Sequence, residues 1–211
     1  MKKLLALALA ATMLVPTTAA VAAEKGSGGY TVGQKLPKKP TVINGILLVN
    51  KSYPLPKTYA PGESKQARSA FIRWQKAAKQ AGYSMTAFST YRSYSYQSTL
   101  YNRYVKKDGK KAADRYSARP GYSEHQTGLA FDIGNPYQTA YYASEKFGTT
   151  NTGKWAAKTA HKYGFIMRYP KGKEKITGYM YEPWHFRYVG KSTATKIYKQ
   201  QVTLEQYLGV Q

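Results

Sequence analysis

The sequence predicts a single α+β domain in which a central antiparallel sheet is packed by helices. Three observations lead to this prediction. The chain has 211 residues, enough for one domain with a substantial core. Helical and strand patterns follow one another without the steady alternation of a parallel sheet. There is no internal repeat and no second linker that would divide the chain.

The first 23 residues have the pattern of a secretory signal peptide. Lys2 and Lys3 precede an apolar stretch over residues 4–15, and small residues at 20–23 offer a cleavage site. The apolar stretch is short for a membrane span, although a retained membrane anchor remains the alternative. We therefore expect residues 1–23 to be cleaved and the mature protein to be secreted.

The next stretch, residues 24–40, is rich in Gly, Lys, Ser and Pro and has few large apolar groups. This composition is typical of a flexible linker. The folded domain is expected over residues 41–211.

Within that domain, hydrophobic spacing and glycine stops predict the elements in order. Ala67, Ala70, Phe71 and Trp74 recur at helical spacing, and Gly82 follows the last turn of that helix. The expected helices cover residues 64–81, 94–107 and 151–163. The expected strands cover residues 85–89, 129–133, 165–169 and 185–189.

The chain is strongly basic, with 33 Lys and Arg residues against 10 acidic ones and a net charge of +23. Without the signal peptide, 31 basic residues remain and the net charge is +21. Such a surface attracts polyanions, and for an exported protein these are anionic wall polymers or lipid headgroups. Nucleic acid is the competing partner but is not expected. The chain has no cysteine, which excludes disulfides and a lipidated cysteine anchor.

Two short segments, residues 123–132 and 182–185, together contain the residue types of a catalytic metal site. His125 and Asp132 lie in the first and Glu182 and His185 in the second, although the chain holds only three histidines. A catalytic zinc takes three nitrogen or oxygen ligands and keeps one open position, so His125, Asp132 and His185 are the expected ligands of Zn²⁺. Glu182 then remains as a general base. A buried polar network without a metal is the alternative.

The spacing of these residues supports that division of roles. Gly128, Ala130 and Asp132 would share one face of a strand, with the two small residues leaving room beneath the metal. Glu182 and His185 are separated by Pro183, which disfavours a regular helix. Two further candidates are assigned differently. We expect Glu124 to make a structural hydrogen bond, and His161 to be a surface or capping residue.

At these positions the chain resembles the VanY-type D-alanyl-D-alanine carboxypeptidases. That group of peptidoglycan peptidases also contains L,D-carboxypeptidases, D,D-dipeptidases and phage L-alanyl-D-glutamate endopeptidases. The resemblance rests on four segments in order along the chain, at residues 91–97, 123–132, 163–170 and 176–190. Together they extend over most of the expected mature chain.

The resemblance implies a zinc ion on His125, Asp132 and His185, with Glu182 as the catalytic base. It also implies that Arg92 lies near the scissile carbonyl, where a guanidinium would stabilise a developing oxyanion. Gln97 and Ser123 match family positions near the substrate. Simpler assignments are a surface salt bridge for Arg92, an exposed helix residue for Gln97, and a capping or turn residue for Ser123.

We therefore expect a secreted, wall-associated zinc carboxypeptidase that removes the terminal D-alanine of peptidoglycan stem peptides, with either D,D or L,D specificity. It is expected to act as a monomer and to need no cofactor beyond the metal. One alternative is an endopeptidase that cuts within the stem peptide or its crossbridge. The other is a non-catalytic, cationic wall-binding module.

Overall fold

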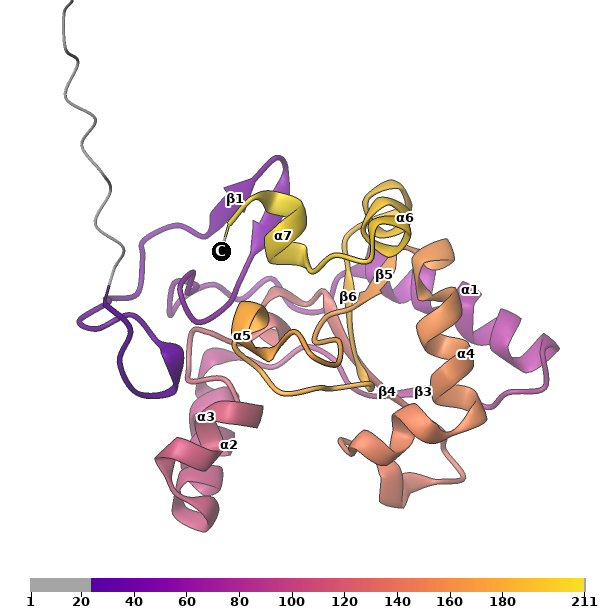
Figure 1. Cartoon of the computed structure of the whole chain (residues 1–211), viewed down its shortest axis with the longest axis horizontal. Coiled ribbons are helices and arrows are strands. Elements are labelled where there is room, and N and C mark those ends of the chain that lie inside the picture. The colour runs from indigo at the N-terminus through magenta and orange to yellow at the C-terminus, as the bar shows by residue number, and fades with distance from the viewer. Residues whose placement is uncertain (1–23, 211) are drawn as a thin grey trace, which may run out of the picture.

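The computed structural model describes residues 24–210 and shows a mixed α/β domain with antiparallel sheets, as predicted. The expected signal peptide, residues 1–23, lies outside the described residues. Among residues 24–210, no helix has the length and apolar character needed to cross a membrane. Figure 1 shows the chain from its first described residues to its C-terminus.

A four-stranded antiparallel sheet forms the centre of the domain, in the order β3-β4-β6-β5. A separate hairpin pairs β1 with β2. The strands are β1 (Thr41–Ile43), β2 (Ile46–Leu48), β3 (Thr86–Ser89), β4 (Ala130–Gly134), β5 (Phe165–Met167) and β6 (His185–Tyr188).

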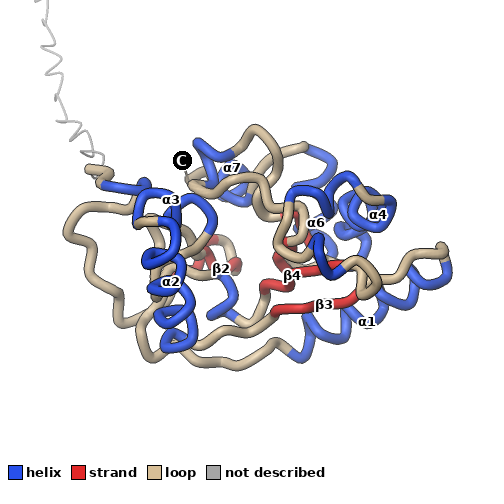
Figure 2. Tube along the Cα trace, turned by 90° about the horizontal axis from the view of Figure 1, so that it is seen from below, coloured by secondary structure: helices blue, strands red, loops and turns tan. Residues whose placement is uncertain are grey.

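Most of the helices lie at two ends of the molecule. In both views α2 and α3 lie at one end, whereas α1, α4 and α6 lie at the other (Figures 1 and 2). The helices are α1 (Lys65–Gln80), α2 (Tyr94–Asp108), α3 (Lys110–Tyr116), α4 (Asn151–Thr159), α5 (Glu174–Thr177), α6 (Lys191–Gln200) and α7 (Leu204–Leu208).

The main core lies between α1, α4 and one face of the central sheet. Phe71 and Trp74 of α1 are buried against Phe131 of β4 and Phe186 of β6. Period-2 alternation sends Phe131 and Phe186 into this core, so the residues beside them point to the opposite face. That opposite face carries the candidate site.

A smaller core ties the C-terminal helices to the edge strand. Leu48 of β2 packs with Ile166 of β5, Ile197 of α6 and Leu204 of α7. The C-terminal segment thereby lies against the same sheet that carries the site residues.

The expected linker differs from the structure. Tyr30 is only 2% exposed, and its hydroxyl accepts a hydrogen bond from the Arg119 backbone N–H at 3.0 Å. Nearby, Ser27 O accepts from the Arg119 guanidinium and Gly28 O accepts from Lys51 Nζ. One buried aromatic ring and two backbone carbonyls fix a stretch whose overall composition is that of a flexible chain, so residues 27–30 are part of the packed domain.

Candidate metal centre and substrate pocket

Asp132 and His185 meet because they are directly opposite each other on β4 and β6. Their neighbours Phe131 and Phe186 form the adjacent pair of the same ladder and point into the core. The two polar side chains therefore share the other face of the sheet. His185 Nδ1 lies 3.0 Å from Asp132 Oδ1, and both side chains are almost completely buried.

His125 reaches the same point from a 3₁₀ turn at Glu124–Thr127, just before β4. Its Nδ1 is hydrogen-bonded to the Thr90 carbonyl oxygen. Its Nε2 lies 3.2 Å from Asp132 Oδ2, yet makes no hydrogen bond although the atom is buried. An imidazole held at one nitrogen by a backbone carbonyl, with the other left free beside a carboxylate, has the arrangement of a metal ligand.

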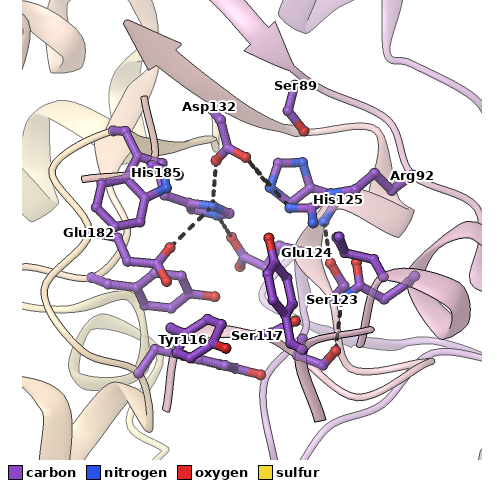
Figure 3. A pocket seen from close by; sticks show the side chains of 18 of the residues that line it. Ser89, Arg92, Tyr116, Ser117, Ser123, Glu124, His125, Asp132, Glu182 and His185 are labelled. Carbon is purple, nitrogen blue, oxygen red and sulfur yellow. Dashed lines mark hydrogen bonds and ion pairs between the residues drawn. The ribbon is translucent and has the colours of Figure 1, made fainter. Parts of the chain in front are cut away.

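These three side chains fit a divalent ion. Within residues 24–210, His125, Asp132 and His185 form a group in which each offers one ligand atom, and these atoms lie within 4.8 Å of one another. Two imidazole nitrogens and a carboxylate oxygen suit zinc, and three protein ligands leave a fourth position for water or substrate. Figure 3 shows the three side chains converging.

Glu124 fixes the orientation of His185, in line with the structural hydrogen bond predicted for it. Its Oε2 lies 3.4 Å from His185 Nε2, so the other ring nitrogen, Nδ1, faces Asp132. Its Oε1 accepts from Arg168 Nε at 2.8 Å and from an Arg187 guanidinium nitrogen at 2.7 Å. Burial alone would raise the pKa of Glu124, but the two arginines outweigh it and hold that pKa well below its usual range.

Glu182 approaches the centre from the segment before β6. The turn that contains Pro183 is closed by a hydrogen bond from His185 N to Glu182 O, which brings Glu182 Oε2 to 3.8 Å from His185 Nδ1. Burial raises the pKa of the Glu182 carboxyl to about 8, against the opposing effect of His185. The carboxyl group is thereby a proton acceptor and donor near neutral pH.

The protein's own groups bias two of the three candidate ligands, His125 and Asp132, toward the protonation states that bind a metal. Burial, with a contribution from the Arg92 charge, lowers the pKa of His125 to about 4. Burial would raise the pKa of Asp132, but His125 and His185 outweigh it and lower that pKa. A neutral His125 and an ionised Asp132 are the forms in which these residues bind a metal.

Arg92 lies beside the metal centre on the segment after β3. Its backbone N–H donates to the His125 carbonyl, and a guanidinium nitrogen lies 3.5 Å from Asp132 Oδ2. Its Nε is buried and has no hydrogen-bond partner. The Arg92 charge therefore faces the centre, and Arg92 does not form the surface salt bridge considered from the sequence.

Gln97 and Ser123 also line the pocket, in different ways. Gln97 is 1% exposed, so the assignment as an exposed helix residue is wrong. Its Nε2 donates to the Ala118 carbonyl at 2.7 Å, whereas its Oε1 is buried without a partner. The Ser123 hydroxyl caps the 3₁₀ turn by accepting from His125 N at 3.3 Å, as the simpler assignment proposed.

The pocket that contains these side chains has a volume of about 530 Å³. Figure 3 shows Ser89 and Arg92 on one side of this pocket and Tyr116 and Ser117 on the other. The site residues come from the segment after β3, from α2, from the turn before β4, from β4, from the segment before β6 and from β6 itself. The antiparallel sheet brings these distant segments together.

Sequence reasoning missed the two buried arginines that support the centre. Arg187 is two residues beyond His185 on β6, so strict alternation places it on the same face, and this signal was available. Arg168 directly follows β5 and is 0% exposed. A basic residue at such a position signals a buried acidic partner, which the sequence does not identify.

Two smaller expectations are corrected or refined. Gly128 does not lie on β4 beside Asp132. It ends the 3₁₀ turn with φ +71°, and a Cβ there would lie 1.9 Å from the Gly62 carbonyl oxygen. His161 lies away from the centre, in a 3₁₀ turn after α4, and stacks on Tyr198 with ring centroids 3.8 Å apart.

Comparisons with known proteins agree with this geometry. Residues 62–191 match the family model VanY, described as D-alanyl-D-alanine carboxypeptidase. A putative carboxypeptidase, YodJ of Bacillus subtilis strain 168, is 43% identical over 183 residues, covering 78% of this chain and 67% of that protein.

Two solved structures are similar. The LdcB LD-carboxypeptidase, described for its peptidoglycan recognition, aligns with a TM-score of 0.72 at 40% identity, covering 82% of this chain and 94% of its own. The vancomycin resistance D,D-pentapeptidase VanY, solved as a mutant in complex with Zn(II), aligns with a TM-score of 0.67 at 33% identity. That alignment covers 77% of this chain and 97% of its own.

Proposed function

The chain belongs to the VanY family of D-alanyl-D-alanine carboxypeptidases, and we propose that it removes the terminal D-alanine of peptidoglycan stem peptides in a zinc-dependent reaction. The observation that carries the proposal is the group of His125, Asp132 and His185 with a buried carboxyl, Glu182, beside it. A structural zinc would need no such neighbouring base. A purely wall-binding module, considered from the sequence, does not account for it.

Zn²⁺ held by His125, Asp132 and His185 would supply Lewis acidity, which lowers the pKa of water and polarises the scissile carbonyl. Glu182 accepts the proton of the attacking water on a carboxylate oxygen and later gives it to the nitrogen of the departing D-alanine. The Arg92 guanidinium stabilises the negative charge that develops on the carbonyl oxygen. Its buried, unbonded Nε is a donor available for that purpose.

Three supporting residues keep the substrate and ligands in place. The Oε1 atom of Gln97 is a buried acceptor with no partner in the protein, so it is suited to receive a substrate N–H. Glu124 holds His185 with Nδ1 toward the centre. Ser123 holds the turn that carries His125 and lines the pocket.

Glu182→Gln tests the mechanism. We expect D-alanine release from a defined pentapeptide or tetrapeptide to fall by at least ~10²-fold, because the proton shuttle is lost. Zinc content, measured by elemental analysis, should remain near that of the wild type. Chelation should abolish the wild-type activity and zinc should restore it. Near-normal activity in the variant would remove Glu182 from this role.

A substrate with an amidated C-terminus tests the terminal specificity. A carboxypeptidase recognises a free terminal carboxylate, so amidation should abolish hydrolysis. Equal cleavage of the free and amidated peptides would favour an endopeptidase instead.

We also propose that the protein is exported and acts at the cell wall. The proposal rests on the signal-like pattern of residues 1–23, the basic composition and the nature of the proposed substrate. N-terminal sequencing of the protein recovered from culture medium and wall fractions should give a start near residue 24. Recovery of an uncleaved chain from membranes would favour the retained anchor.

A further inference from the structure

The substrate pocket continues well beyond the metal centre along one face of α2. Its lining includes Tyr96, Gln97, Leu100, Arg103, Tyr104 and Lys107. These residues recur at helical spacing, so they form a single stripe facing the pocket. Tyr116 and Ser117 line the pocket as well, and Tyr116 packs edge-on against Tyr104 with ring centroids 5.1 Å apart. We refer to this part of the pocket as the α2 limb.

The α2 limb has the length of several substrate residues. Helical rise is about 1.5 Å per residue, so the stripe from Tyr96 to Lys107 extends over roughly 16 Å. An extended peptide advances about 3.3 Å per residue. A substrate with its scissile bond at the metal centre could therefore place about five further residues along the limb, the third of them near Arg103.

Two cations in the limb are left without acidic partners. Arg103 and Lys107 both line the pocket, and neither forms an ion pair within residues 24–210. The one acidic side chain that lines this outer part, Asp108, accepts a hydrogen bond from the Tyr116 hydroxyl at 2.5 Å. The outer limb thus carries a net positive charge.

Near the metal centre, the same helix face offers a neutral acceptor. Gln97 Oε1 is buried and unpaired, and Nε2 donates to Ala118 O, so the acceptor side of the amide is the free side. The polarity of the limb therefore changes along its length, from an acceptor for N–H groups near the centre to cations farther out. An extended peptide with an amide near the scissile bond and a negative charge farther upstream matches this order.

We propose that Arg103 and Lys107 form a subsite for a carboxylate of the stem peptide, located two or three residues upstream of the scissile bond. This inference rests on the proposed function. Stem peptides offer such a group on the α-carbon of D-glutamate, and some offer another on the side chain of a diaminopimelate third residue. Both are carboxylates at the right distance. The chain should therefore prefer stem peptides in which these groups are free over those in which they are amidated or absent.

The test is a comparison of substrates and variants. Four peptides of one length would combine free or amidated D-glutamate with diaminopimelate or lysine at the third position. D-Alanine release would be measured for the wild type, for the double variant Arg103→Gln/Lys107→Gln, and for a control, Lys106→Gln/Lys110→Gln. The control removes the same charge from α2 and the start of α3 at side chains that do not line the pocket.

For the wild type, kcat/KM should be about tenfold higher on a peptide with a free carboxylate, mainly through KM, since charge-assisted contacts at a partly exposed site are of this size. In the double variant this ratio should fall toward one, and the control should keep it. The wild-type preference should also shrink as salt is raised, because the limb is open to solvent. If the preference appears between free and amidated D-glutamate, the bound group is the D-glutamate carboxylate. If it appears between diaminopimelate and lysine, the bound group is the side-chain carboxylate of diaminopimelate.

Other outcomes contradict one proposal or the other. Hydrolysis of all four peptides at equal rates, or a ratio that survives in the double variant, would overturn the carboxylate subsite and leave the proposed function intact. A loss shared equally by all four peptides would show that the two cations have only a structural role. Release of D-alanine from none of the peptides by zinc-loaded wild type would contradict the proposed function itself.

Discussion

At the scale of single residues, the metal centre depends on a buried acid that does not itself belong to the ligand group. Glu124 is 1% exposed, and it contacts His185, Arg168 and Arg187 at once. A carboxylate that holds a ligand histidine by its far nitrogen fixes the tautomer and orientation of the ring. Glu124 would thus contribute to metal binding without touching the ion.

Glu124→Gln keeps the shape of this side chain and removes its charge. We expect zinc affinity to fall by ~10- to 100-fold, because His185 loses its orienting carboxylate. We also expect the free energy of unfolding to fall by about 3–5 kcal/mol, because Arg187 is left buried without its acidic partner. Competition with a zinc indicator and urea unfolding measure the two effects.

Glu174→Gln is the matched control. It removes an acid from an exposed pair with Arg115, 3.3 Å apart, where a change below about 1 kcal/mol is expected. Equal losses in the two variants would show that burial of Glu124 has no special effect.

At the scale of elements, the turn that carries His125 is locked to the segment before α1. Gly128 has φ +71°, its N–H donates to the His125 carbonyl, and its own carbonyl accepts from Ser64 N, the N-cap of α1. A side chain at position 128 would meet the Gly62 carbonyl oxygen at 1.9 Å. The turn can approach this closely only with glycine at that position.

Gly128→Ala should lower the free energy of unfolding by about 2–4 kcal/mol, combining an unfavourable backbone conformation with a clash. Gly82→Ala is the matched comparison, because Gly82 has φ +82° with nothing within 4 Å of an added Cβ. At position 82 only the unfavourable backbone conformation, about 1 kcal/mol, would lower the free energy of unfolding. Urea unfolding of both variants separates the clash from the backbone effect. Equal losses would contradict the close approach to Gly62.

The same elements show what the sequence could and could not predict. Helix α1 was predictable because Ser64, the apolar spacing of Ala67 to Trp74 and Gly82 all indicate the same boundaries. The helix expected over residues 151–163 instead ends at Thr159 and continues as a 3₁₀ turn. The β1–β2 hairpin and the C-terminal helices α6 and α7 are not predicted from the sequence, because short segments gain their structure mainly from tertiary packing.

For the candidate site, the three residues that converge could be named from their chemistry, but the residues that support them could not. The opposition of Asp132 and His185 depends on the register of β4 and β6, and no local pattern specifies that pairing. Tyr30 was assigned to a linker because residues around it are small and polar, yet one buried ring is enough to fix the segment.

At the scale of the whole molecule, Lys51 joins segments that are far apart in the sequence. Its Nζ donates to Gly28 O at 2.7 Å and to Asp114 O at 2.8 Å, and lies 4.6 Å from the ring centroid of Tyr179. Tyr179 in turn lines the substrate pocket. Burial lowers the pKa of Lys51 to about 8, only partly opposed by Asp114.

This lowered pKa predicts a pH dependence of stability. In the folded state Lys51 loses its proton near pH 8, whereas in the unfolded chain it keeps that proton up to about pH 10.5. Between these values the unfolded state binds more protons, so the contribution of Lys51 to the free energy of unfolding rises with pH. Below about pH 8 the cost of burying the charged amine is fully present.

Urea unfolding at pH 7.5 and 9.5 checks this prediction against Lys51→Met. The wild type should gain more stability than the variant between the two pH values, whatever the absolute stability of each. An equal change in both proteins would show that Lys51 titrates normally.

The pairing of Arg168 with both Glu124 and Glu205 has a consequence for folding. Glu205 lies on α7, and it also accepts a hydrogen bond from Asn50. A chain in which α7 has not yet docked already contains all three candidate ligand residues, yet lacks the acid that holds Arg168 beside Glu124. We therefore expect metal uptake to be delayed until α7 has docked, so a partly folded chain would be poorly able to capture zinc or to cut peptides.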